Sequence, residues 1–156
     1  METDGNGFYR AFQGIAPCGV FILTIKYFII MSTIPVILTI AGSDCSGGAG
    51  IQADIKTISA LKGYAASVIT AVTAQNTMGV QAVCPIPPDI VRAQITSVMD
   101  DLQPVAIKIG MVHNAAIVHT VAECLQKFRP RFVVYDPVMV STSGRKLMTE
   151  DTVRTI

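Results

Sequence analysis

The sequence predicts an α/β fold in which helices cover a mostly parallel β-sheet. Short apolar runs such as IPVILTI (34–40) lack the alternation of a half-exposed strand and end in loops, which is typical of strands buried on both faces. Segments with helical periodicity separate these runs. Strands that alternate with helices of this length indicate β-α-β units and hence a parallel sheet.

The amino-terminal elements follow from apolar spacing and from turn residues. Ile51, Ile55, Ile58 and Leu61 share one face of a predicted helix, which Gly63 ends. AASVITAV is the second buried strand, and a polar turn, TAQNTMG, and a short strand, VQAVC, follow it. The predicted strands cover 35–41, 65–72, 80–84, 105–109 and 132–136, and the predicted helices cover 50–62, 88–101 and 114–128.

The two later helices begin with recognisable start signals. Prolines and Asp89 open the helix over 88–101, and Asn114 is the expected N-cap of the helix over 114–128. The helix over 88–101 has only a loose apolar face, formed by Ile90, Ala93, Ile95, Val98 and Leu102. VAIKIG and RFVVYDPVM supply the last two strands.

Composition excludes several classes of function. The net charge is +1, and scattered Lys and Arg residues argue against a nucleic-acid surface. The cysteines do not form a CxxC pair, and the two histidines lie far from three of them, so neither a zinc site nor a disulfide framework is expected. Reduced thiols fit a cytoplasmic protein. The cysteines are Cys18, Cys45, Cys84 and Cys124.

Residues 1–30 differ from the rest of the chain. A polar, glycine-rich start precedes VFILTIKYFII, an apolar stretch with Lys26 in its middle. A membrane-spanning helix needs about 20 apolar residues, and Lys26 and Pro35 interrupt the run. We expect an extension outside the fold, a domain over 31–156, and no membrane partner; a membrane or export segment is the alternative.

The ends of the predicted strands point to a ligand site. The carboxyl ends of parallel strands meet at one edge of the sheet, where ligands bind. The glycine loop at 47–50 permits close backbone approach, and the helix after it offers N–H groups for a hydroxyl, a phosphate or a ring edge. The loop matches neither G-x-G-x-x-G nor a P-loop, so a flexible turn is the alternative.

AGSDCSGGAGIQAD, followed in order by VTAQNT, KIGM and VVYDPVM, resembles the hydroxymethylpyrimidine/phosphomethylpyrimidine kinases of thiamine biosynthesis, in the ribokinase-like superfamily. The resemblance covers 34–156 and departs at Cys45, where the family commonly has proline. It implies a ribokinase-like three-layer α-β-α fold with a mostly parallel central sheet and its C-terminal part missing. The chain would then be the N-terminal half of a pyrimidine-kinase domain.

The resemblance also implies a reaction and a pocket. The family transfers phosphate from ATP, with Mg²⁺, to 4-amino-5-hydroxymethyl-2-methylpyrimidine and then to its monophosphate. Family residues matching Gly42, Asp54, Gln75, Met111 and Val138 line the pyrimidine pocket. Gln75 can donate and accept hydrogen bonds at once, while Met111 and Val138 can sandwich a ring.

The two acids have alternative interpretations. Taken without the surrounding motif, Asp54 is better explained as a first-turn helix acid that interacts favourably with the helix dipole. Asp136 matches an acid near the metal and phosphates in related vitamin kinases, and the alternative is a cap of the following turn. A homodimer is implied for full-length family members.

Two family motifs do not occur in these 156 residues. They are the anion-hole motif G-T-G-C, with its catalytic residue, and an N-x-x-E motif that serves Mg²⁺. We therefore expect most of the substrate half, no catalytic residue, and no turnover by this chain alone. The alternatives are a non-catalytic fragment or binding module, and a relative of pyridoxal kinase, although the uninterrupted glycine-loop motif argues for the pyrimidine.

Overall fold

The computed structural model describes residues 34–138 and 152. The chain divides into two units, 1–35 and 36–156, and every element below belongs to the second. The strands are β1 (Val36–Asp44), β2 (Tyr64–Asn76), β3 (Gly79–Pro85), β4 (Ala106–Ile109) and β5 (Phe132–Tyr135), and the helices are α2 (Gly50–Ala60), α3 (Pro88–Asp101) and α4 (Ala115–Phe128). The predicted extension over 1–30 lies outside the described residues and stays a prediction.

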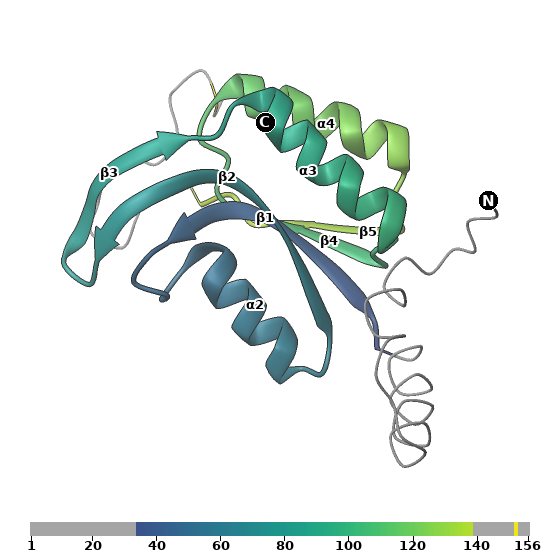
Figure 1. Ribbon diagram of the computed structural model, residues 1–156, viewed down its shortest axis with the longest axis horizontal. Coiled ribbons are helices and arrows are strands. Elements are labelled where there is room, and N and C mark those ends of the chain that lie inside the picture. Colours follow the sequence, from purple (N-terminus) through teal and green to yellow (C-terminus); the bar gives the residue numbers. More distant parts are fainter. Residues whose placement is uncertain (1–33, 139–151, 153–156) are drawn as a thin grey trace, which may run out of the picture. The chain divides into compact units, whose positions relative to one another are not determined.

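The five strands form one mixed sheet in the order β3-β2-β1-β4-β5. β1 pairs in parallel with β2 and with β4, and β5 pairs in parallel with β4. β3 is antiparallel to β2 and lies at one edge. Helix α2 covers one face, and α3 and α4 cover the other (Figure 1). The predicted α/β fold with a mostly parallel sheet between helical layers is confirmed.

The main core lies between the sheet and the pair α3 and α4. Leu38 and Ile40 of β1 are fully buried there, together with residues of the neighbouring strands and of both helices. Thr39, between them, is also fully buried but faces α2, where it donates a hydrogen bond to Asp54. β1 is thus covered on both faces, as its continuous apolar sequence predicts.

Start signals in the sequence located the two later helices well. α3 begins at Pro88 and ends at Asp101, as predicted. Asn114 is the N-cap of α4, and its side-chain oxygen accepts a hydrogen bond of 3.0 Å from the backbone N–H of Ile117. Prolines and a capping amide act locally, so their effect is visible before the fold is known.

The predicted polar turn over 73–79 is wrong in its extent. β2 continues to Asn76, and its last residues pair with β3, which leaves only Thr77 and Met78 as the turn. The polar side chains there stand on a two-stranded ribbon with an irregular register between Ala74 and Gln75. A hairpin satisfies the backbone of polar residues as well as that of apolar ones, and composition alone does not reveal it.

The end of α2 also differs from the prediction. The helix ends at Ala60, and Leu61, expected on the buried face, is 78% exposed. Lys62 takes the left-handed conformation, with a φ of 64°. Gly63 follows it, and its N–H donates to Ile58 O (2.9 Å) across the end of the helix. A Cβ atom at Gly63 would also lie 2.8 Å from Ile58 Cγ2.

The buried face of α3 is shifted from the predicted one. Its buried residues are Val91, Ile95 and Met99, which are spaced four residues apart. Of the predicted residues, Val98 and Leu102 pack partly buried against the core, while Ala93 is exposed and Ile90 is 49% exposed. The sequence shows apolar residues on both sides of this row, and only the position of the sheet decides which of them are covered. Within the described part of the chain, no helix is long and apolar enough to cross a membrane.

Candidate active site

A cavity of about 430 Å³ lies at the carboxyl edge of the sheet, between the ends of β1, β2 and β4 and the glycine loop. Four predicted pocket residues line it: Gly42, Gln75, Met111 and Val138. The other two predicted site residues, Asp54 and Asp136, are not among its lining residues. A volume of this size suits a small ligand.

Asp44 shapes the glycine loop. Its carboxylate is buried, and Oδ1 accepts hydrogen bonds from the Ser46 N–H (2.8 Å) and the Ser46 hydroxyl (2.7 Å). Oδ2 accepts from the N–H groups of Gly48 (3.0 Å) and Ala49 (2.8 Å). Burial by itself raises the pKa of Asp44, but these hydrogen bonds outweigh burial and hold the pKa below its ordinary value.

This arrangement corrects two expectations for the loop. The N–H groups of Gly48 and Ala49, just before α2, bind the protein's own carboxylate and not a ligand. The loop is also more than a flexible turn, because α2 holds it at two further points. Gln52 accepts from the Asp44 N–H (2.9 Å) and donates to the Ser43 hydroxyl (2.8 Å), and Lys56 Nζ donates to Gly47 O (2.8 Å).

Gly50 allows the loop to close on the end of β1. Its φ is 58°, and a Cβ atom there would lie 2.2 Å from the carbonyl oxygen of Gly42. No side chain fits at that distance, so only glycine permits this approach. The loop therefore forms a fixed wall of the cavity.

Gln75 stands at the end of β2, against the glycine loop. Its side-chain Oε1 lies 3.2 Å from the hydroxyl of Thr73, which lies 2.9 Å from Ser43 O. The thiol of Cys45 donates to Gln75 O (3.0 Å), and the Gln75 N–H lies 3.3 Å from the Cys45 sulfur. Cys45 thus ties the loop to the backbone of Gln75.

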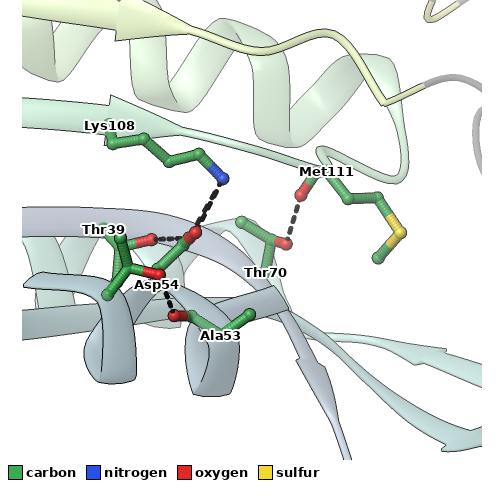
Figure 2. Close-up of polar contacts among 7 residues, drawn as sticks. Thr39, Ala53, Asp54, Thr70, Lys108 and Met111 are labelled. Carbon is green, nitrogen blue, oxygen red and sulfur yellow. Dashed lines mark hydrogen bonds and ion pairs between the residues drawn. The ribbon is translucent and has the colours of Figure 1, made fainter. Parts of the chain in front are cut away.

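Met111 and Val138 form the apolar side of the cavity. They pack with Ala71, which is fully buried. The hydroxyl of Thr70 donates a hydrogen bond of 2.8 Å to the carbonyl oxygen of Met111 and so fixes the backbone after β4 (Figure 2). A Cβ atom at Gly42 would lie 2.5 Å from Met111 Cε, so the glycine makes room for the methionine side chain.

Asp54 lies beside the cavity and not in its lining. It occupies the second turn of α2, where the first turn contains no acid. The hydroxyl of Thr39 donates to Asp54 Oδ2 (2.5 Å), and Lys108 Nζ lies 3.0 Å from both carboxylate oxygens (Figure 2). Lys108 does line the cavity. The first-turn interpretation of Asp54 is therefore wrong, and its carboxylate is paired with a lysine that lines the cavity.

Sequence reasoning overlooked Asp44 and Lys108, although each left a signal. An aspartate followed two residues later by serine, before a glycine run, is typical of a turn that a carboxylate closes on its own backbone. A lysine inside the apolar strand VAIKIG needs a buried partner or a polar space.

Asp136 follows β5 and is exposed. Its N–H donates to Ile109 O (2.8 Å), which continues the pairing of β5 with β4. Among the described residues, no group of three His, Cys, Asp or Glu side chains could hold a metal ion.

Comparisons with known proteins agree with this geometry. The family described as phosphomethylpyrimidine kinase matches residues 44–156. The hydroxymethylpyrimidine/phosphomethylpyrimidine kinase of Salmonella typhimurium is 54% identical over 119 residues, which cover 76% of this chain and 45% of that protein. The chain thus spans about half the length of this curated relative.

Two solved structures share the fold. The phosphomethylpyrimidine kinase of Clostridium difficile matches with a TM-score of 0.74 and 50% identity, over 78% of this chain and 52% of that one. The pyridoxal kinase of Staphylococcus aureus in complex with AMP-PCP matches with a TM-score of 0.63 and 35% identity, over 72% of this chain and 41% of that one. The family match covers well over half of the sequence, so the chain belongs to the phosphomethylpyrimidine kinase family.

Proposed function

We propose that this chain supplies the substrate half of an ATP-dependent kinase of thiamine biosynthesis. Its substrates would be 4-amino-5-hydroxymethyl-2-methylpyrimidine and the corresponding monophosphate. The observation that carries the proposal is the cavity at the carboxyl edge, which brings together Gly42, Gln75, Met111 and Val138 from segments far apart in the sequence. These are four of the five positions that the family resemblance assigns to the pyrimidine pocket.

The cavity suits a flat, polar-edged ring. The amide of Gln75 offers a donor and an acceptor, which match an amino group and a neighbouring ring nitrogen. Met111 and Val138 offer apolar surface to the ring. The loop held by Asp44 needs no reorganisation to form its wall, and preorganisation of this kind favours binding.

ATP as donor is supported by the similarity to a kinase structure in complex with AMP-PCP. Magnesium is part of the same proposal. The described residues offer it Asp136 but no complete ligand set, so we assign no step to the metal here.

We further propose a homodimer for the full-length protein and a cytoplasmic location. The free thiols of Cys45, Cys84 and Cys124 suit that location.

Pyridoxal is the second candidate substrate. A pyridoxal kinase shares the fold at 35% identity, whereas the phosphomethylpyrimidine kinase structure reaches 50%. Pyridoxal also carries a hydroxymethyl group on an aromatic heterocycle, but it lacks the amino group that Gln75 would recognise.

Calorimetric titration of the chain with hydroxymethylpyrimidine, pyridoxal and ATP tests the proposal. We expect binding of the pyrimidine, with pyridoxal weaker. An ADP-release assay on a version extended through G-T-G-C tests catalysis. Absence of pyrimidine binding, or of turnover by the extended version, would count against the proposed function. If the chain binds the pyrimidine but the extended version shows no turnover, the binding-module alternative is favoured.

A further inference from the structure

Lys108 is an unusual residue for its place in the sheet. It stands in β4 between Ile107 and Ile109, which are 1% and 6% exposed. The two isoleucines face the core under α3 and α4. Lys108 points to the opposite face, towards α2, and pairs across the sheet with Thr39 of β1.

A partly buried ion pair forms at this point. The side chains of Lys108 and Asp54 are 27% and 18% exposed, and Nζ lies 3.0 Å from each carboxylate oxygen. Thr39, fully buried, donates to the same carboxylate. Apolar residues can often replace such a pair without loss of stability, so stability alone does not explain it. Charged groups held this way beside a cavity are candidates for function.

The ammonium is aimed along the strand towards the ligand edge. Gly110 follows β4, and a Cβ atom there would lie 2.9 Å from Lys108 Nζ and 3.1 Å from Ala41 Cβ. The absence of a side chain at Gly110 therefore leaves the space that the ammonium occupies. Lys108, Gly110 and Ala41 all line the cavity, while Asp54 does not.

We propose that Lys108 is the residue of this network that contacts the ligand, and that Asp54 acts through it. The Lys108 ammonium donates a hydrogen bond to an acceptor atom of the bound heteroaromatic molecule. Asp54, held by Thr39, positions the ammonium and balances its charge. The proposal rests on the proposed function for its choice of ligand, and it differs from a direct contact between Asp54 and the pyrimidine.

The number of N–H donors on the Lys108 ammonium supports this assignment. An ammonium carries three N–H donors, and one carboxylate with two oxygens engages two of them, which leaves a donor for the cavity. A ring nitrogen, a hydroxymethyl oxygen and a phosphate oxygen are all acceptors of the kind it would bind. Hydroxymethylpyrimidine and its monophosphate distinguish among these acceptors, because only the second carries a phosphate.

The test is a double-mutant cycle read by calorimetric titration with hydroxymethylpyrimidine. We expect Lys108→Met to weaken binding by about 10- to 100-fold, because a charged donor is lost from the ligand site. We expect Asp54→Asn to weaken binding less. In the Lys108→Met background, Asp54→Asn should change Kd by less than about twofold, because its effect passes through the missing lysine.

Two results would overturn the proposal. One is unchanged affinity in Lys108→Met. The other is an equal loss from Asp54→Asn in both backgrounds, which would mean that Asp54 meets the ligand itself. Lys127→Met, at an exposed position of α4, is the matched control and should bind as the wild type does. Lys108→Met alone leaves the Asp54 carboxylate unpaired and could fail to fold. In that case the affinities of Asp54→Asn and of the double variant are compared. The double variant leaves no unpaired charge, so the difference still measures the contribution of Lys108 to ligand binding.

Gly110→Ala tests the same idea without removing a charge. Its methyl group would displace Nζ, so we expect weaker binding in the wild type and no further loss in the Lys108→Met background. A loss of equal size in both backgrounds would contradict the proposal.

The choice of ligand is tested separately from the role of Lys108. If the wild type binds pyridoxal but no pyrimidine, the proposed function fails, whereas the same double-mutant cycle run with pyridoxal still decides the role of Lys108. If it binds neither, both are wrong.

Discussion

At the scale of single residues, the site depends on a carboxylate that binds the backbone of its own loop. Asp44 accepts four hydrogen bonds, from Ser46, Gly48 and Ala49, and so holds the loop that forms one wall of the cavity. Every one of these partners is a donor. The acid therefore cannot be exchanged for an amide without placing an NH₂ group against N–H or O–H groups.

Asp44→Asn is expected to lower the free energy of unfolding by about 1–3 kcal/mol, because buried donors lose their acceptor. Urea unfolding followed by circular dichroism measures the change. Asp101→Asn, an exposed acid at the end of α3, is the control and should unfold nearly as the wild type does. An unchanged midpoint in Asp44→Asn would show that the loop does not depend on this carboxylate.

The lowered pKa of Asp44 also predicts a pH dependence. A carboxyl whose pKa is lower in the folded state binds protons more readily when unfolded, so its contribution is fully present above the unfolded pKa. That contribution is lost as the pH falls through the folded pKa. We expect the stability difference between wild type and Asp44→Asn to be constant above about pH 5 and to shrink below about pH 4. A difference that grows on acidification would contradict this.

Gln75→Ala is expected to weaken binding of hydroxymethylpyrimidine by about 1–3 kcal/mol, because the polar edge of the ring is left unpaired. Calorimetric titration measures the loss. Gln126→Ala, on the exposed surface of α4, is the control. The backbone of Gln75 is held by Cys45 and stays in place, so unfolding midpoints should change little. If Gln75→Ala and Gln126→Ala bind hydroxymethylpyrimidine equally well, Gln75 does not contact the ligand.

Much of the candidate site was predictable at this scale, and the rest was not, for a definite reason. Gly42 and Gln75 lie in the last residues of β1 and β2, and Met111 and Val138 follow β4 and β5. Parallel strands bring these carboxyl ends together whatever the details of packing. Asp54 is different, because its direction depends on which strand residue lies beneath α2. That residue is Lys108, 54 positions along the chain, and no local pattern reveals the pairing.

At the scale of elements, one side chain substitutes for a strand. β3 pairs with β2 only from Ala71 onwards, so among the described residues no strand pairs with that edge of β2 before this point. Gln94 of α3 fills the place. Its Oε1 accepts from the Ile69 N–H (3.0 Å) and its Nε2 donates to Ile69 O (3.2 Å). The amide thus repeats the donor and acceptor pair of a neighbouring backbone and fastens α3 to the sheet.

Gln94→Leu keeps the size of the side chain but leaves both groups of Ile69 unpaired, which costs about 1–3 kcal/mol. Hydrogen exchange gives a specific measurement, because the Ile69 amide should exchange faster while the amides in the middle of β1 change only with global stability. Gln126→Leu is the control, since that residue is exposed on α4. An unchanged exchange rate of the Ile69 amide would show that the hydrogen bonds from Gln94 do not stabilise this edge of β2.

The same scale shows what local sequence can and cannot establish. α3 and α4 were located because prolines and Asn114 act on the adjacent backbone. The ends of α2 and β2 were misplaced because distant partners decide them. Residues 74–76 are strand because β3 folds back on them. Leu61 is exposed because the chain turns towards β2 one residue earlier than its apolar spacing implies.

At the scale of the whole molecule, the described sheet is covered unevenly. The central strand β1 is buried on both faces, whereas β5 is an edge strand of apolar residues. Its residues Phe132, Val133 and Val134 are 54%, 43% and 59% exposed. Because neighbouring side chains of a strand point to opposite faces, β5 shows apolar surface on both sides. In the described sheet no strand pairs with its outer row of backbone groups.

We expect the 156-residue chain to self-associate through β5 as its concentration rises, because an exposed apolar edge strand pairs readily with another strand. Light scattering after size exclusion, over a range of concentrations, measures the association. Phe132→Lys should reduce it, since a charge on an edge strand opposes strand pairing. Phe132 pairs with Ala106, at the opposite end of β4 from the cavity, so ligand binding should survive the change. Leu61→Lys is the control, because Leu61 is 78% exposed but lies on no strand. A chain that stays monomeric at high concentration would contradict the prediction. An equal reduction of self-association by Phe132→Lys and Leu61→Lys would also contradict it, because the contact would then not depend specifically on β5.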